Sequence, residues 1–161
     1  METFELTRKL LSFGPQYDVR TAAAPDVVST IKGKVLSATP ELAMHDGTAE
    51  GPQSASMKGN FMKTKFECFD KDAKPLGTLS FPMLALKKSF TLQTGGQEYK
   101  ADGGYLGGEF TCKDAQGETV LTITKQLSLR EKFAISTSGA IPRELALLAA
   151  VAIEQRLFEE A

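Results

Sequence analysis

The chain closes on an apolar segment that restricts its fold more than any other feature. Every side chain from Leu145 to Ile153 is apolar, so a helix formed there would have no face suited to water. Pro142 and Glu144 favour a helix that begins at this point. Proline is tolerated in the first helical turn, and an acidic side chain stabilises the positive end of the helix dipole. We therefore predict a helix over residues 142–158.

Such a helix could lie in a bilayer or in the core of a protein. Residues 143–158 would form a helix about 24 Å long at about 1.5 Å per residue. A bilayer core is about 30 Å thick and needs about 20 apolar residues. Glu154, Gln155 and Arg156 interrupt the apolar run before that length is reached. We therefore expect no transmembrane span and predict a buried helix.

Four windows of the chain repeat one pattern, which predicts how the remainder folds. They are LLSFGPQYDV (10–19), VLSATPELAM (35–44), MLALKKSFTL (83–92) and QLSLREKFAI (126–135). In each, a leucine precedes Ser or Ala, and apolar residues follow five and seven positions after that small residue. An apolar pair two residues apart is typical of a strand, and the residues before it favour a turn. Three windows also have a lysine three positions before the small residue, namely Lys9, Lys34 and Lys125.

A second internal similarity predicts β-hairpins. FECFDKDAKPLGTL (66–79) and FTCKDAQGETVLTI (110–123) share Phe, Cys and Asp at matching positions, followed by an apolar pair. Their centres are rich in turn-forming residues. Cys68 and Cys112 are in phase with the preceding phenylalanines, so we expect both thiols to point inward and to be unreactive.

Many short strands at regular spacing predict a mainly β protein, closed or nearly closed into a barrel. A barrel with an internal void needs an apolar filling, and the final helix is the only candidate in the sequence. Four alanines keep that helix thin, namely Ala146, Ala149, Ala150 and Ala152. We predict one domain over residues 1–161, threaded by its own carboxyl-terminal helix, since 161 residues suit a single core.

Composition narrows the class of partner and the compartment. The formal net charge of −1 argues against a general nucleic-acid-binding protein, which needs a basic excess. Two cysteines make no disulfide framework, and the amino terminus has no apolar stretch of signal-peptide length. We therefore expect a cytoplasmic protein.

Catalytic signals are weak throughout the chain. His45, the one histidine, stands beside Asp46 and suits either proton transfer or a turn. The GGYLGG stretch (103–108) lacks the Gly-Lys-Ser/Thr of a phosphate loop and precedes Glu109, which favours an inter-strand connection. No G-x-S-x-G motif is present. We expect no enzyme, no cofactor and no metal site.

Basic residues near predicted turns are the candidate site. Lys63 and Lys65 are predicted to share a strand face, while the other four occupy corresponding turns of two repeats. The six candidates are Lys63, Lys65, Lys87, Lys88, Arg130 and Lys132. They would form an anion-binding patch if the repeats place these turns at one barrel end. The alternative is a set of solvated charges balanced by nearby acidic residues.

Four segments of the chain resemble one known group of proteins. TRKLLSFGPQYDVR, FDKDAKPLGTL, FTCKDAQGETVLTITKQLSLREKFAI and ALLAAVAIEQRLFE are similar to the LURP-one-related and phospholipid scramblase-like family of the tubby carboxyl-terminal superfamily. The resemblance spans nearly the whole chain. It implies a closed antiparallel barrel of about 12 strands around a buried hydrophobic helix. Tubby-like members bind phosphoinositide headgroups through basic residues.

The resemblance implies a non-enzymatic binding or scaffold domain that contacts anionic membrane lipids peripherally. A protein-interaction module using a strand edge or loop is the alternative. A scramblase-type lipid transporter is a third possibility that fits poorly. Its acidic calcium segment would lie near residues 101–118, where Asp102, Glu109 and Asp114 are diluted by glycines. Calcium takes about six to eight oxygen ligands.

Overall fold

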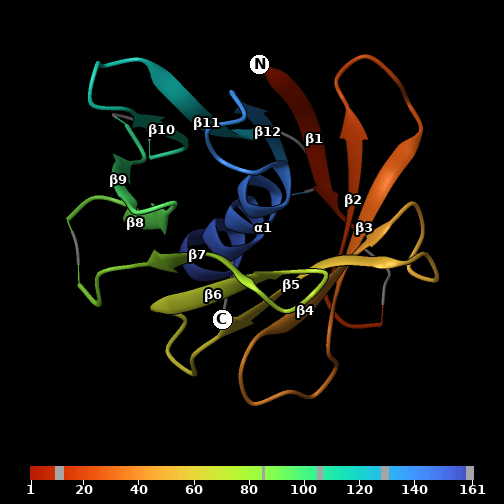
Figure 1. Ribbon diagram of the computed structural model, residues 1–161. Helices are drawn as coiled ribbons and strands as arrows, with labels where there is room; N and C mark the ends of the chain where they lie inside the picture. The colour runs from red at the N-terminus through yellow and green to blue at the C-terminus, as the bar shows by residue number, and fades with distance from the viewer. Residues whose placement is uncertain (10–12, 85, 105–106, 128–130, 159–161) are drawn as a thin grey trace.

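A central helix surrounded by antiparallel strands makes up the computed structural model (Figure 1). The structure describes residues 1–161 except 10–12, 85, 105–106, 128–130 and 159–161. The strands are β1 (Glu2–Arg8), β2 (Gln16–Thr21), β3 (Val27–Gly33), β4 (Glu41–Asp46), β5 (Gln53–Gly59), β6 (Lys65–Asp70), β7 (Pro75–Ser80), β8 (Ser89–Thr94), β9 (Gln97–Asp102), β10 (Glu109–Lys113), β11 (Thr119–Gln126) and β12 (Lys132–Thr137). The helix α1 (Arg143–Ile153) continues into a π-helical segment, η1 (Glu154–Phe158).

The strands form one sheet that curls around the helix. Apart from β9 and β10, each strand pairs with its neighbours in sequence. β1 also pairs with β12, so that Leu6 lies opposite both Val19 and Phe133. The sheet ends at β9 and β10, which lie side by side. No ladder of backbone hydrogen bonds joins these two strands in the part of the chain that the structure describes. The fold is therefore a nearly closed twelve-stranded antiparallel barrel, which confirms the predicted fold class.

The repeated hairpins have a common turn geometry. In β6–β7, Asp70 Oδ1 accepts hydrogen bonds from the backbone N–H groups of Asp72 and Lys74 at 2.8 and 2.9 Å. In β10–β11, Asp114 Oδ1 accepts from Gln116 and Glu118, each at 2.9 Å. A β-bulge follows Cys68 in one hairpin and Cys112 in the other. The aspartates shared by the two sequences thus serve as equivalent turn caps.

The helix fills the barrel, as its composition predicts. All residues from Leu145 to Ile153 are buried. Pro142 is the N-cap rather than the first helical residue, and its carbonyl accepts the Ala146 N–H at 2.9 Å. A side chain at Gly77 would come within 2.8 Å of Leu145 Cδ2, so the helix requires a glycine on β7 at this point. Burial of each helix leucine contributes about 1.5–3 kcal/mol.

None of the helices in the described part of the chain is long and apolar enough to span a bilayer.

Candidate functional site

Antiparallel order places alternate connections at opposite ends of the barrel. The connections that follow odd-numbered strands share one end, and they comprise residues 9–15, 34–40, 60–64, 81–88, 103–108 and 127–131. All four repeated windows have their turns here. Segment η1 reaches the same end, since the helix returns from the far end of β12. The structure thus brings together the turns that the sequence repeat singled out.

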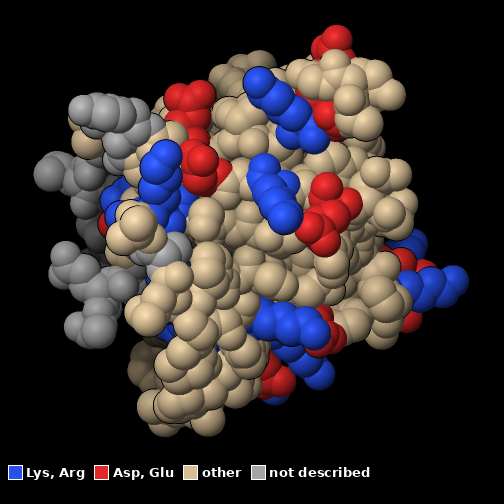
Figure 2. Space-filling model, turned by 90° about the vertical axis from the view of Figure 1, so that its left-hand side faces the viewer, with Lys and Arg blue, Asp and Glu red and all other residues tan. Residues whose placement is uncertain are grey.

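The connections at the two ends of the barrel differ in the charge of their side chains. The described charged residues in the connections of this end are Lys9, Lys34, Lys63, Lys87, Lys88 and Glu131. Those of the opposite end are Asp26, Glu50, Lys71, Asp72, Lys74, Asp114 and Glu118. We call the first set of connections the lysine rim and the second the acidic rim. Figure 2 shows the barrel wall over β8–β10, where blue and red side chains are interspersed.

Three of the six predicted basic residues, Lys63, Lys87 and Lys88, lie in the lysine rim, and Lys65 and Lys132 begin the strands next to it. Lys87 and Lys88 are exposed in the β7–β8 connection. Lys65 begins β6 and pairs with Glu67 at 3.8 Å, and Lys132 begins β12 and pairs with Glu5 at 3.2 Å. The sixth residue, Arg130, falls outside the described residues.

Lys63 does not share a strand face with Lys65, contrary to the sequence prediction. It lies in the turn before β6, with a φ of 57°. The Asn60 side chain accounts for this turn, because its Oδ1 accepts the N–H groups of Thr64 at 2.8 Å and Lys65 at 3.2 Å. The turn begins after Gly59 and ends only at Lys65.

Two lysines converge on one aromatic ring at the rim. The Nζ of Lys125 lies 4.6 Å from the ring centroid of Phe158, and the Nζ of Lys88 lies 5.4 Å from it. Such cation–π contacts hold ammonium groups over the ring face. Lys125 also pairs with Glu131 at 3.2 Å. Gly107 lies beside this group, and a Cβ there would be 3.9 Å from Lys88 Nζ.

Sequence reasoning missed the exposed apolar side chains of the rim. The pair at positions five and seven is buried in the following strand in all four windows, as predicted. The leucine that opens the pattern is instead exposed in the connection, as shown by Leu36, Leu84 and Leu127. Its equivalent Leu11 lies outside the described residues. A leucine directly beside turn-forming residues was the available signal.

We define the apolar tips as the large apolar residues of the lysine rim that are at least 73% exposed. They are Phe13, Leu36, Phe61, Leu84, Leu86 and Leu127. Val35, Met62 and Met83 add partly exposed apolar surface beside them. Elsewhere in the described chain, the large hydrophobics classed as exposed are Met1 and Val28. Exposed apolar surface is therefore concentrated where the lysines are.

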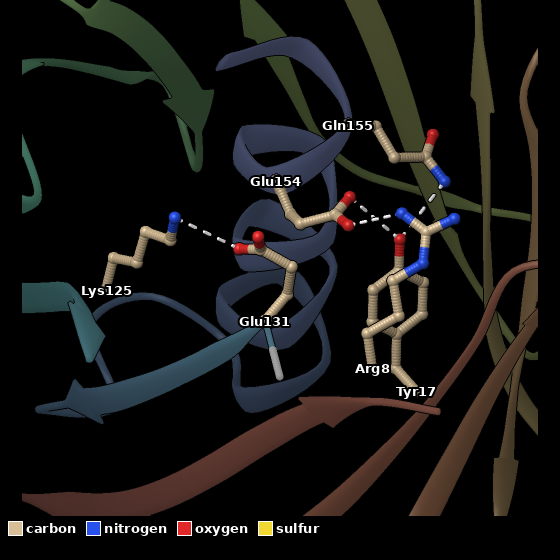
Figure 3. A network of polar contacts seen from close by, with 6 residues as sticks. All are labelled: Arg8, Tyr17, Lys125, Glu131, Glu154 and Gln155. Carbon is tan, nitrogen blue, oxygen red and sulfur yellow. Dashed lines mark hydrogen bonds and ion pairs between the residues drawn. The ribbon is translucent and has the colours of Figure 1, made fainter. Parts of the chain in front are cut away.

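Below the rim, a buried polar network fixes the end of the helix. Figure 3 shows Arg8 and Tyr17, from β1 and β2, pointing together toward Glu154 at the start of η1. Glu154 has no exposed surface, forms an ion pair with Arg8 and accepts a hydrogen bond from the Tyr17 hydroxyl at 3.1 Å. Gln155 donates to the Tyr17 hydroxyl at 3.4 Å.

The network suits a structural role more than proton transfer. Burial, followed by the negative charge of Glu154, raises the pKa of Tyr17 well above its ordinary value. The phenol therefore stays neutral and acts as a hydrogen-bond donor. Arg8 provides the positive charge that a carboxylate buried at this depth requires. The sequence identified Glu154 only as an interruption of the apolar run, because its partners lie more than 130 residues away.

The residues considered for catalysis have structural partners. His45 lies on β4 rather than in the turn, and its Nδ1 is 2.9 Å from the carbonyl oxygen of Gly51. Cys68 and Cys112 are buried on inward positions, and burial raises the pKa of each thiol to about 12. Both thiols are therefore protonated and unreactive in the folded protein at neutral pH.

The acidic segment considered for calcium does not converge. Glu109 begins β10, whereas Asp114 follows its far end and caps a turn. The Asp102 carboxylate accepts the Gly104 N–H at 2.9 Å. In the described part of the chain, no three acidic, histidine or cysteine side chains cluster as metal ligands would.

Comparison with known proteins identifies the fold. No family model and no curated protein matches the sequence. The barrel is similar to the X-ray structure of a protein from Arabidopsis thaliana, AT5G01750, with a TM-score of 0.59 and 9% sequence identity. The match covers 94% of this chain and 88% of the Arabidopsis chain. At this identity the similarity is one of fold.

Proposed function

We propose that this protein is a non-enzymatic binding domain that recognises anionic phosphoinositide headgroups at its lysine rim. We also propose that it is a member of the LURP-one-related and scramblase-like group of the tubby superfamily, on the basis of its sequence resemblance together with its barrel. The observation that supports headgroup binding is the separation of charge, with lysines in the connections of one end and mainly acidic residues in those of the other.

Lysines in the rim and beside it support the binding of a phosphorylated headgroup. Lys88 and Lys125 point their ammonium groups at one ring, and Lys87 is adjacent in sequence and exposed. Each lysine near an anionic membrane surface contributes about 1 kcal/mol to binding. The opposite end would be repelled by the same surface, so the charge separation would also orient the domain.

Two further features support a binding role at the cytoplasmic face of a membrane. The thiols are buried and protonated, and His45 contacts a backbone carbonyl, so neither offers an activated catalytic group. Cys68 and Cys112 are both unpaired, as is usual in a reducing compartment.

Vesicle sedimentation at physiological salt tests the proposal. We expect the protein to bind phosphatidylcholine vesicles that contain a phosphoinositide, and to leave pure phosphatidylcholine vesicles unbound. Lys87→Ala/Lys88→Ala should weaken binding about thirtyfold, from about 1 kcal/mol per lysine. Lys71→Ala/Lys74→Ala removes the same charge from the acidic rim and should leave binding unchanged. Equal loss in both variants, or no selective binding by the parent protein, would refute headgroup recognition at the lysine rim.

A protein-interaction module is the second candidate, favoured by the open junction between β9 and β10. A groove of about 600 Å³ lies there, lined among others by Asp102, Glu109, Thr111 and Lys125. An extended peptide could pair with the strand edges along this groove. Absence of vesicle binding, together with a partner that binds the parent protein but not Thr111→Arg, would favour this function.

A further inference from the structure

The apolar tips are not accounted for by folding. Leu36, Leu86 and Leu127 retain essentially their full accessible surface, and Leu84 and Phe13 retain more than four-fifths of theirs. Leu36 also adopts a φ of 58°, a conformation that costs a leucine more than a glycine or asparagine. Neither packing nor backbone conformation favours leucine at that position. Another surface must bury these side chains if they contribute to stability or function.

The apolar tips all lie at one end of the barrel, where a single external surface can contact them. The tips come from five of the connections that make up the lysine rim, those after β1, β3, β5, β7 and β11. Leu84 and Leu86 share one connection and the other tips have one each, while apolar positions of the strands that follow the repeated turns are directed into the core. Side chains distributed in this way are accessible to a surface that lies across that end.

The neighbouring charges select a membrane over a protein as that surface. Lys34 precedes Val35 and Leu36, Lys63 follows Phe61 and Met62, and Lys87 follows Leu86. Lysine is depleted in protein interfaces, and leucine is under-represented among the residues that dominate their binding energy. Leucine and phenylalanine next to lysine are instead the side chains of interfacial membrane segments. Lysine stems can extend from such tips so that the ammonium groups reach anionic headgroups.

We propose that the apolar tips insert into the acyl-chain boundary of an anionic bilayer while the neighbouring lysines contact its headgroups. This inference rests on the proposed headgroup binding and adds the mode of attachment to it. The central helix remains in the barrel, so the membrane contact is made by the turns alone. Affinity then has an apolar part that salt does not screen in addition to the electrostatic part.

Single-tryptophan variants can detect insertion directly, because the chain has no tryptophan. With vesicles of phosphatidylcholine and phosphatidylserine, Leu84→Trp fluorescence should shift to shorter wavelength and be quenched by phospholipids brominated in their acyl chains. Ala115→Trp, in the turn between β10 and β11 at the acidic rim, should show neither effect. Quenching that is absent from Leu84→Trp, or equal for both variants, would refute insertion.

Polar substitutions at the tips separate this inference from headgroup binding. Leu84→Ser/Leu86→Ser should reduce vesicle affinity at least about tenfold, since burial of even one leucine is equivalent to that factor. Its melting temperature should stay that of the parent protein, because both side chains are exposed. Unchanged affinity in this variant, with Lys87→Ala/Lys88→Ala still impaired, would refute insertion and leave headgroup binding intact. Impaired affinity of Leu84→Ser/Leu86→Ser together with unchanged affinity of Lys87→Ala/Lys88→Ala would refute headgroup binding alone. Absence of any vesicle binding would refute both insertion and headgroup binding.

Discussion

At the residue scale, the environment of Glu154 shows how one charged side chain fixes a long apolar helix in place. The carboxylate has no exposed surface, and it contacts the Arg8 guanidinium and the Tyr17 hydroxyl. A carboxylate is costly to bury without a positive partner, because water no longer solvates it. The network therefore links the end of α1 to β1 and β2 in one geometry.

Replacement of Arg8 should show how strongly the network holds. Arg8→Met removes the positive charge and should lower the free energy of unfolding by about 3–5 kcal/mol. Arg20→Met is the matched control: Arg20 lies 3.9 Å from Asp18 in a partly exposed pair, whose loss should cost at most about 1 kcal/mol. Urea unfolding measures both. Equal losses would mean that the Glu154 network does not fix the helix end.

At the scale of single elements, the same residue type has opposite environments in α1 and in the rim. Leu148 is fully buried in the helix, whereas Leu86 is fully exposed in the β7–β8 connection. The apolar helix is explained by the barrel that surrounds it. The apolar tips of the lysine rim have no such explanation within the fold.

Leucine-to-alanine substitutions should separate these two roles. Leu148→Ala leaves a cavity inside the barrel and should lower the free energy of unfolding by about 2–5 kcal/mol. Leu86→Ala removes the same atoms from an exposed tip and should change it by less than about 0.5 kcal/mol. Chemical denaturation of both variants checks this. A stable Leu148→Ala protein would contradict the central role of the helix.

At the scale of the whole molecule, closing the barrel buries ionisable groups in their neutral forms. Cys68 and Cys112 lie on different hairpins, and Tyr17 lies on a third. Burial is the main cause of the raised pKa in all three groups. Their raised pKa values are thus a property of the assembled fold.

Stability should therefore decline at alkaline pH. The thiols of the unfolded chain ionise near their ordinary pKa of 9.0, while burial raises the pKa of the folded thiols to about 12. Between these values the native state binds more protons, so the free energy of unfolding falls with rising pH by about 1.4 kcal/mol per unit and per group. Below pH 8 these groups should cause no dependence. Cys68→Ala/Cys112→Ala should have a shallower decline in denaturant titrations, and an unchanged slope would contradict the assignment.

Local patterns in the sequence predicted much of this structure. Alternation of apolar residues depends only on strand geometry, so the hairpins, the inward cysteines and the strand pairs of the repeats were accessible. The all-apolar run from Leu145 to Ile153 required burial on every side, and its length argued against a bilayer. The approximate strand count came from the family resemblance.

Tertiary structure alone decided how distant residues meet. The pairing of Glu154 with Arg8, and the approach of Lys88 and Lys125 to Phe158, join segments that no local pattern relates. The strict antiparallel order placed every repeated turn at one end, and so separated lysines and exposed leucines from the acidic connections. The sequence by itself determined which residues must avoid water, because that follows from side-chain chemistry. Which apolar residues remain in water at the lysine rim was settled only when the barrel closed, because closure uses one face of each strand and leaves the turns outside.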